Sequence, residues 1–306
     1  MLNETARGVY TIAVTPFLPD GAVDFDSVDR MTDFYLEKGA TGLTILGIMG
    51  EAGKLGADEA IAVIKRVVAR ATVPVIVGVS SAGFAAMQTL ANAAMDAGAA
   101  GVMVAPTSGL RTDDQIAGYY RTTAQMLGTI PFVLQDFPLV TGVQISAKTI
   151  LQIVDENPTC VMLKHEDWPG LDKISALRAA CDAGARRISI LCGNGGQFLP
   201  EEVMRGADGA MTGFAFPEMM ARVVAAIDAG DTDRARDIFD CYLPLVRYES
   251  QPGAGLAVRK YILNQRGAIA HDTVRAPGAA LNAAGRTEVD ALIARQFRRL
   301  GDIGLN

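Results

Sequence analysis

Eight short apolar runs recur along the 306-residue chain, and stretches with helical character separate them. The runs are apolar at both odd and even positions, which is typical of parallel strands covered on both faces. They are spaced roughly 20 to 30 residues apart, which is the length of one strand followed by one helix. The eight runs are residues 9–14, 42–46, 75–79, 101–105, 131–134, 160–163, 188–192 and 209–212.

Helix start signals lie between these runs, such as Asp26 and the pair Asp58 and Glu59. Eight strand-helix units in succession predict an α/β fold, a (β/α)8 TIM barrel. A doubly wound open sheet is the alternative, and the number of strands disfavours it. The predicted helices are residues 26–38, 58–70, 84–97, 112–127, 146–156 and 171–183.

The pattern changes near Asp231, where the strand-like runs stop and helical character continues to about Leu300. We therefore predict a barrel at residues 1–230 and a C-terminal helical extension at residues 231–306. No Ser/Pro-rich linker separates the two parts, so the extension is expected to pack on the barrel rather than form an independent domain.

Composition and charge exclude several classes of function. The net charge is -6 and the Lys and Arg residues are scattered, so we expect no nucleic-acid partner. No apolar run reaches membrane-spanning length, and the first residues lack the pattern of a secretory signal, so no membrane partner is expected. The four cysteines show no CxxC spacing, which favours reduced thiols in a cytoplasmic protein. With only two histidines, we expect no metal site.

Lys164 closes the apolar run Cys160–Leu163, and no other lysine follows a strand-like run in this way. Burial disfavours the charged form of an amine, and the neutral amine is the form that attacks a carbonyl. The alternatives are a lysine whose head reaches solvent from a strand end, or an ion pair with Glu166 or Asp167. The remaining lysines, at positions 38, 54, 65, 148, 173 and 260, are expected in polar, solvated surroundings.

Four features in order along the chain resemble the dihydrodipicolinate synthase and N-acetylneuraminate lyase family. They are Gly47-x-x-Gly50-Glu51, Pro138, Lys164 and the glycine turn at Gly193, and the resemblance spans about Gly8 to Leu300. It implies a barrel enzyme with a C-terminal helical extension that forms a Schiff base with a small-molecule 2-oxo acid. It also implies no cofactor and a homo-oligomer, either a tetramer or a dimer.

The chain departs from the family at several positions. The family usually carries two adjacent threonines after strand 2, where this chain has Ile48 and Met49, so only backbone N–H groups remain there to bind a substrate carboxylate. Gln135 replaces the family's proton-shuttling tyrosine, and an amide cannot shuttle a proton as a phenol does. Val140 stands where dihydrodipicolinate synthases carry an arginine for a second carboxylate.

These departures favour another branch of the family. Gln135-Asp136-x-Pro138, Lys164-x-Glu166 and Met211-Thr212-Gly213 resemble sugar-acid dehydratases such as 2-keto-3-deoxy-arabonate dehydratase. The predicted function is a Schiff-base-forming lyase, a dehydratase or retro-aldolase, acting on a 2-oxo acid such as pyruvate or a 2-keto-3-deoxy sugar acid. Dihydrodipicolinate synthase proper and a non-catalytic binding member of the family are the alternatives.

The predicted site follows from these matches. The catalytic candidates are Lys164, Gln135 and Glu166, and the substrate-binding candidates are Ile48, Met49, Gly193, Asn194 and Thr212. The turn at residues 193–196 has an alternative role as a phosphate cradle.

Neighbouring polar residues are expected to have structural roles. Glu51 is expected to anchor the loop after strand 2, and Asp136 to cap the next helix. His165 should face away from Lys164, because alternate residues of a strand point to opposite faces.

Overall fold

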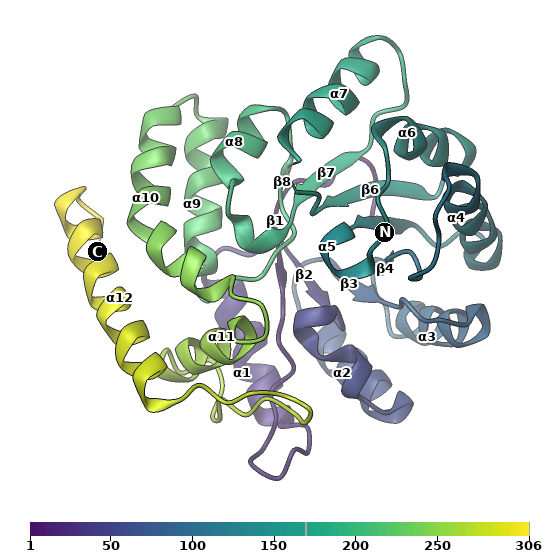
Figure 1. The fold of residues 1–306 in the computed structure, drawn as a ribbon. Helices are drawn as coiled ribbons and strands as arrows, with labels where there is room; N and C mark the ends of the chain where they lie inside the picture. The colour runs from purple at the N-terminus through teal and green to yellow at the C-terminus, as the bar shows by residue number, and fades with distance from the viewer. Residues whose placement is uncertain (169, 306) are drawn as a thin grey trace.

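The computed structural model describes residues 1–168 and 170–305. Within these residues, eight parallel strands close into a barrel in chain order (Figure 1). The predicted TIM barrel is confirmed, and the doubly wound open sheet is excluded because strand β1 pairs with strand β8. The strands are β1 Gly8–Ile12, β2 Gly42–Ile45, β3 Val75–Gly78, β4 Gly101–Val104, β5 Phe132–Asp136, β6 Cys160–His165, β7 Ser189–Cys192 and β8 Gly209–Ala210.

Two strands run further than their apolar residues indicate. In the ladder between β5 and β6, Gln135 pairs with Lys164 and Asp136 pairs with His165. All four residues are buried. Polar residues extend these strands because each one has partners inside the protein, which an apolar pattern cannot reveal. Strand β8 is shorter than predicted, with two residues.

The six predicted helices are present, with small differences at their starts. The first begins at Phe25 rather than after Asp26, because the Asp24 side chain caps it by accepting a hydrogen bond from the Ser27 N–H at 3.0 Å. Short turns η1 Ile48–Gly50, η2 Ala52–Lys54 and η3 Asn194–Gly196 follow β2 and β7. The helices around the barrel are α1 Phe25–Glu37, α2 Ala57–Arg70, α3 Phe84–Asp96, α4 Asp113–Leu127, α5 Pro138–Thr141, α6 Ala147–Glu156, α7 Leu171–Asp182, α8 Leu199–Met204 and α9 Pro217–Asp228.

The C-terminal extension consists of α10 Thr232–Glu249, α11 Gly255–Gln265 and α12 Ala283–Asp302. Helix α10 packs against α9, and α12 lies along the outer side of α10 and α11 (Figure 1). Asp231 caps α10, at the boundary predicted between barrel and extension, while Asn306, the last residue of that extension, lies outside the described residues.

Helix α11 overturns one prediction about the lysines. Its residues 257–263 are all buried, and Lys260 is wholly buried rather than solvated. Burial lowers the pKa of Lys260, and the Glu51 carboxylate beside it opposes that effect. Lys173 is also largely buried, with 10% of its side chain exposed. Because α11 is covered on all sides, its sequence has no amphipathic pattern that would reveal the burial of Lys260.

Two apolar clusters form the core. A smaller cluster fills the barrel interior, with side chains such as Ile76, Met103, Val133 and Leu191. The larger cluster lies between the strands and the surrounding helices. No helix among residues 1–168 and 170–305 is long and apolar enough to cross a membrane.

Candidate active site

A cavity of about 500 Å³ opens at the carboxyl ends of the strands. In TIM barrels this end of the strands carries the reacting groups, since loops from every strand converge there. All three catalytic candidates, Lys164, Gln135 and Glu166, line this cavity. Of the substrate-binding candidates, Ile48, Met49, Asn194 and Thr212 line it too.

Lys164, Glu166 and Gln135 form a connected cluster. Lys164 Nζ lies 2.8 Å from Glu166 Oε1, and the Gln135 side-chain amide donates a hydrogen bond of 2.7 Å to the same oxygen. The Lys164 and Glu166 side chains are only 7% and 6% exposed. The ion pair considered for Lys164 is therefore present, and both of its residues line the cavity.

The turn after β7 shapes the pocket around Glu166. The Asn194 backbone N–H donates to Glu166 Oε2 at 3.3 Å, and the Asn194 side chain donates to the Glu166 carbonyl at 2.8 Å. A Cβ on Gly193 would lie 2.1 Å from Glu166 Cγ, so this position requires glycine. In the part of the chain that the structure describes, Gly193 leaves room for the Glu166 side chain and is not among the residues that line the cavity, so its role in substrate binding stays a prediction.

The phosphate-cradle alternative does not fit this turn. The Asn194 N–H is directed to Glu166, the Gly195 N–H donates to Thr212 Oγ1 at 2.8 Å, and the Gly196 N–H donates to the Gly193 carbonyl. A phosphate needs such N–H groups unpaired and pointing toward it. In this turn they already have partners within the protein.

On the outer side of β5 and β6 lies a second polar cluster. Asp136 accepts a hydrogen bond from Lys173 Nζ at 2.8 Å, so its predicted role as a helix cap is wrong. Burial, opposed by Lys173, raises the pKa of Asp136 to about 6. His165 is wholly buried and turned toward the helices, as predicted, with Nε2 3.0 Å from the Gly170 carbonyl. Burial lowers the pKa of His165 to about 4, so its ring is neutral at pH 7.

Sequence reasoning missed a buried ion pair that the C-terminal extension contributes to the cavity wall. Arg259 Nε donates to Glu249 Oε1 at 2.6 Å, and Arg259 Nη2 donates to the Gly213 carbonyl at 2.5 Å. Both side chains line the cavity and are about 5% exposed or less. Burial raises the pKa of Glu249, and Arg259 opposes that effect. The strand-end rule could not reveal these residues, because they come from helices outside the barrel.

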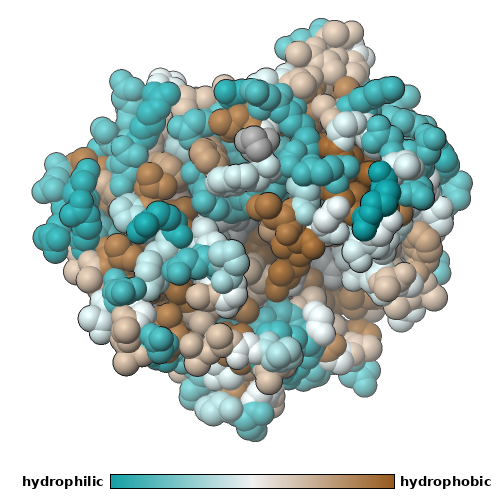
Figure 2. Space-filling model, viewed as in Figure 1, coloured by the Kyte–Doolittle hydropathy of each residue, from teal (hydrophilic) through white to brown (hydrophobic). Residues whose placement is uncertain are grey.

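Exposed apolar side chains surround the cavity entrance. Ile48, Leu139 and Val140 are 51%, 65% and 55% exposed, and all three line the cavity. Figure 2 shows an apolar patch at the centre of the molecular face, close to α5 in the view of Figure 1. Ile48, Leu139 and Val140 therefore offer no charged group to a second carboxylate of a substrate.

Comparisons with known proteins identify the family. The sequence pattern described as the dihydrodipicolinate synthetase family matches residues 5–296. The chain belongs to this family. The predicted family is confirmed, and the protein is a lyase.

Individual relatives carry two different names. The chain is 35% identical over 237 residues to a 4-hydroxy-tetrahydrodipicolinate synthase of Sorangium cellulosum, covering 75% of this chain and 76% of that protein. It is 28% identical over 302 residues to an L-2-keto-3-deoxyarabonate dehydratase of Azospirillum brasilense, covering 94% of each. A crystal structure described as a dihydrodipicolinate synthase of Rhodopseudomonas palustris is 54% identical, with a TM-score of 0.95, covering 96% of this chain and 99% of that one.

Proposed function

We propose that this family member forms a Schiff base at Lys164 and dehydrates a 2-oxo acid that carries a hydroxyl group two carbons from the carbonyl, such as a 2-keto-3-deoxy sugar acid. The observation that carries the proposal is the Lys164–Glu166–Gln135 cluster within the cavity. The cluster places a buried amine and a carboxylate 2.8 Å apart, within reach of one bound substrate.

The chemistry requires three steps, after which water hydrolyses the imine and releases the product and the free Lys164 amine. The Lys164 amine attacks the substrate carbonyl carbon, and water leaves to give a protonated imine. The imine withdraws electrons, so a base removes a proton from the neighbouring carbon. The hydroxyl on the next carbon then takes up a proton and departs as water. We assign both proton transfers to Glu166, whose Oε1 faces the amine.

Other residues bind and orient the substrate in this proposal. Gln135 holds the Glu166 carboxylate in place through its amide hydrogen bond and transfers no proton. The backbone N–H groups of Ile48 and Met49, on the loop after β2, receive the substrate carboxylate. We assign the Asn194 and Thr212 side chains, which belong to residues that line the cavity, to binding of the substrate hydroxyl groups.

Dihydrodipicolinate synthase proper is the second candidate, and the names of several relatives favour it. That reaction involves a second carboxylate, whereas the entrance carries apolar Leu139 and Val140. A non-catalytic 2-oxo-acid-binding protein is the third candidate, but such a protein has no need for the Lys164 amine beside Glu166.

The test is trapping of the Schiff base by borohydride. Treatment with pyruvate or a 2-keto-3-deoxy sugar acid should add the reduced substrate to the peptide that contains Lys164. Lys164→Ala should lose both the adduct and turnover, while Lys148→Met, a change at an exposed lysine, should retain both. An unmodified Lys164 together with full activity of Lys164→Ala would exclude the mechanism. Ligand-induced stabilisation without product across a panel of sugar acids would favour the non-catalytic candidate.

A further inference from the structure

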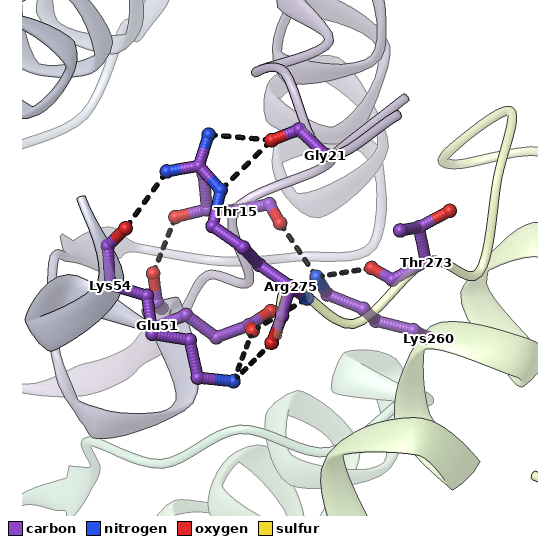
Figure 3. A network of polar contacts seen from close by, with 8 residues as sticks. Thr15, Gly21, Glu51, Lys54, Lys260, Thr273 and Arg275 are labelled. Carbon is purple, nitrogen blue, oxygen red and sulfur yellow. Dashed lines mark hydrogen bonds and ion pairs between the residues drawn. The ribbon is translucent and has the colours of Figure 1, made fainter. Parts of the chain in front are cut away.

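A buried lysine of the C-terminal extension reaches the base of the substrate-binding loop. Lys260 Nζ donates to the Thr15 carbonyl at 2.8 Å, to Glu51 Oε1 at 2.5 Å and to the Thr273 carbonyl at 2.8 Å (Figure 3). Three acceptors satisfy the three donors of the ammonium group. Because the Lys260 side chain is 0% exposed and that of Glu51 is 1% exposed, water does not screen their attraction.

Glu51 ends the loop that carries Ile48 and Met49. It follows the η1 turn directly, and its φ of +55° lies in the left-handed region that residues other than glycine rarely adopt. Leu46, just before the loop, also has a φ of +55°. Backbone of this kind persists only where surrounding contacts hold it, so the loop depends on its anchors.

Further contacts hold the same loop. The Glu51 carboxylate also accepts hydrogen bonds from Lys54 Nζ at 2.8 Å and from the Arg275 backbone N–H at 3.0 Å. Figure 3 shows Lys54 and Lys260 approaching Glu51 from two directions. Thr15 Oγ1 donates to the Gly50 carbonyl at 2.6 Å. Lys260 therefore connects the segment that follows β1, the loop after β2 and the segment that follows α11.

Glu51 and Lys260 do not line the cavity in the described part of the chain, whereas Ile48 and Met49 do. The ion pair is therefore placed to act on the substrate through the loop. We propose that Lys260 is a positioning residue, which through Glu51 holds the loop so that the Ile48 and Met49 N–H groups bind the substrate carboxylate. The inference rests on the proposed function for the identity of the ligand.

The test compares a carbonyl compound that has a carboxylate with one that has none. Borohydride trapping at Lys164 is measured with pyruvate and with acetaldehyde in Glu51→Gln and Lys260→Met. Both variants should need at least about tenfold more pyruvate for half-maximal trapping, with the maximal rate kept within about twofold. Trapping with acetaldehyde should stay within about twofold of the wild type, because this compound has no carboxylate for the loop to bind.

If Lys260→Met does not fold, Glu51→Gln tests the ion pair, and a further variant tests the other anchor of the same loop. Thr15→Val removes the hydrogen bond to Gly50 on the other side of the loop and keeps the shape of a buried side chain. It should weaken pyruvate trapping in the same selective way. Lys65→Met, a change at an exposed helical lysine, is the matched control and should behave as the wild type.

Amide hydrogen exchange of residues 47–50 in the ligand-free protein separates this inference from the proposed function. Faster exchange in Glu51→Gln and Thr15→Val supports the anchoring role, even if the wild type forms no adduct and the proposed function fails. Unchanged exchange would overturn the inference, as would an equal loss of trapping with pyruvate and acetaldehyde.

The double variant Glu51→Gln/Lys260→Met tests whether the two residues act as one unit. Its pyruvate trapping should equal or exceed that of the more impaired single variant, because the second substitution then removes nothing further.

Discussion

The proposed proton transfers depend on the side-chain carboxylate of Glu166. Its Oε1 atom contacts both the Lys164 amine and the Gln135 amide, and Gly193 leaves room for its side chain. We expect Glu166→Gln to lower the turnover rate about 100-fold, which is typical for loss of a general acid-base group. Steady-state rates on the substrate found by trapping measure this effect.

The adjacent carboxylate provides the control. Asp167 pairs with Lys173 at 2.6 Å, outside the Lys164 cluster, so Asp167→Asn should lower the rate less than about tenfold. Borohydride trapping should still modify Lys164 in Glu166→Gln, which separates proton transfer from imine formation. A rate within about tenfold of the wild type would assign the proton transfers to another group.

The cavity residues that lie at the end of a strand or just after it could be predicted from the sequence. Lys164, Gln135 and Glu166 meet because parallel strands end at one side of the barrel, so their approach follows from the fold. Arg259 and Glu249 reach the same cavity from helices outside the barrel, and no strand-end pattern indicates them. The burial of Lys260 depends on carbonyl and carboxylate acceptors far away in the sequence, which one helix cannot reveal.

Among the elements, α8 carries a buried carboxyl group with a consequence for stability. Glu202 is 7% exposed, and its Oε2 atom has no hydrogen-bond partner within residues 1–168 and 170–305. Burial raises the pKa of Glu202 to about 8, although the Cys192 thiol beside it has the opposite effect. The folded state therefore holds a proton that the unfolded state releases above about pH 4.5, and the stabilisation is lost as the pH rises toward 8.

Glu202→Gln keeps the shape of this side chain and removes its titration. The free energy of unfolding should exceed that of the wild type by on the order of 3 kcal/mol at pH 9, with little difference at pH 5. Urea unfolding at both pH values measures the difference. Glu201→Gln, one residue earlier on α8 and less buried, should show no such pH dependence. Parallel pH profiles for Glu202→Gln and the wild type would contradict this assignment.

The sequence predicted the approximate bounds of strands and helices where apolar residues reach the ends of these elements. The order of strands and helices was predictable because every strand of this barrel is buried on both faces. The ends of β5 and β6 were not, since Gln135, Asp136, Lys164 and His165 continue the strands as polar residues with internal partners. Helix α11 shows the same limitation, because burial on all sides removes the amphipathic pattern.

At the scale of the whole molecule, the C-terminal extension buries side chains of the barrel that would otherwise be exposed. Tyr242 of α10 packs against Phe214 and Phe216, with ring centroids 6.2 and 5.7 Å apart, and all three residues are at most 1% exposed. Lys260 and Arg259 add buried polar contacts to the segments that follow β1 and β8. Without the extension, the barrel would expose these aromatic side chains and leave the buried Glu51 without its Lys260 partner.

We therefore expect the barrel and the extension, which the sequence divides at residue 230, to fold as one cooperative unit. A protein of residues 1–230 should aggregate or lack a cooperative thermal transition, because large apolar surfaces become exposed. The full chain should unfold in one calorimetric transition whose measured and van't Hoff enthalpies per cooperative unit agree. Differential scanning calorimetry of the two proteins makes this comparison. A cooperative transition of residues 1–230 near that of the full chain would show that the barrel folds independently, and Lys260 would then be dispensable for folding.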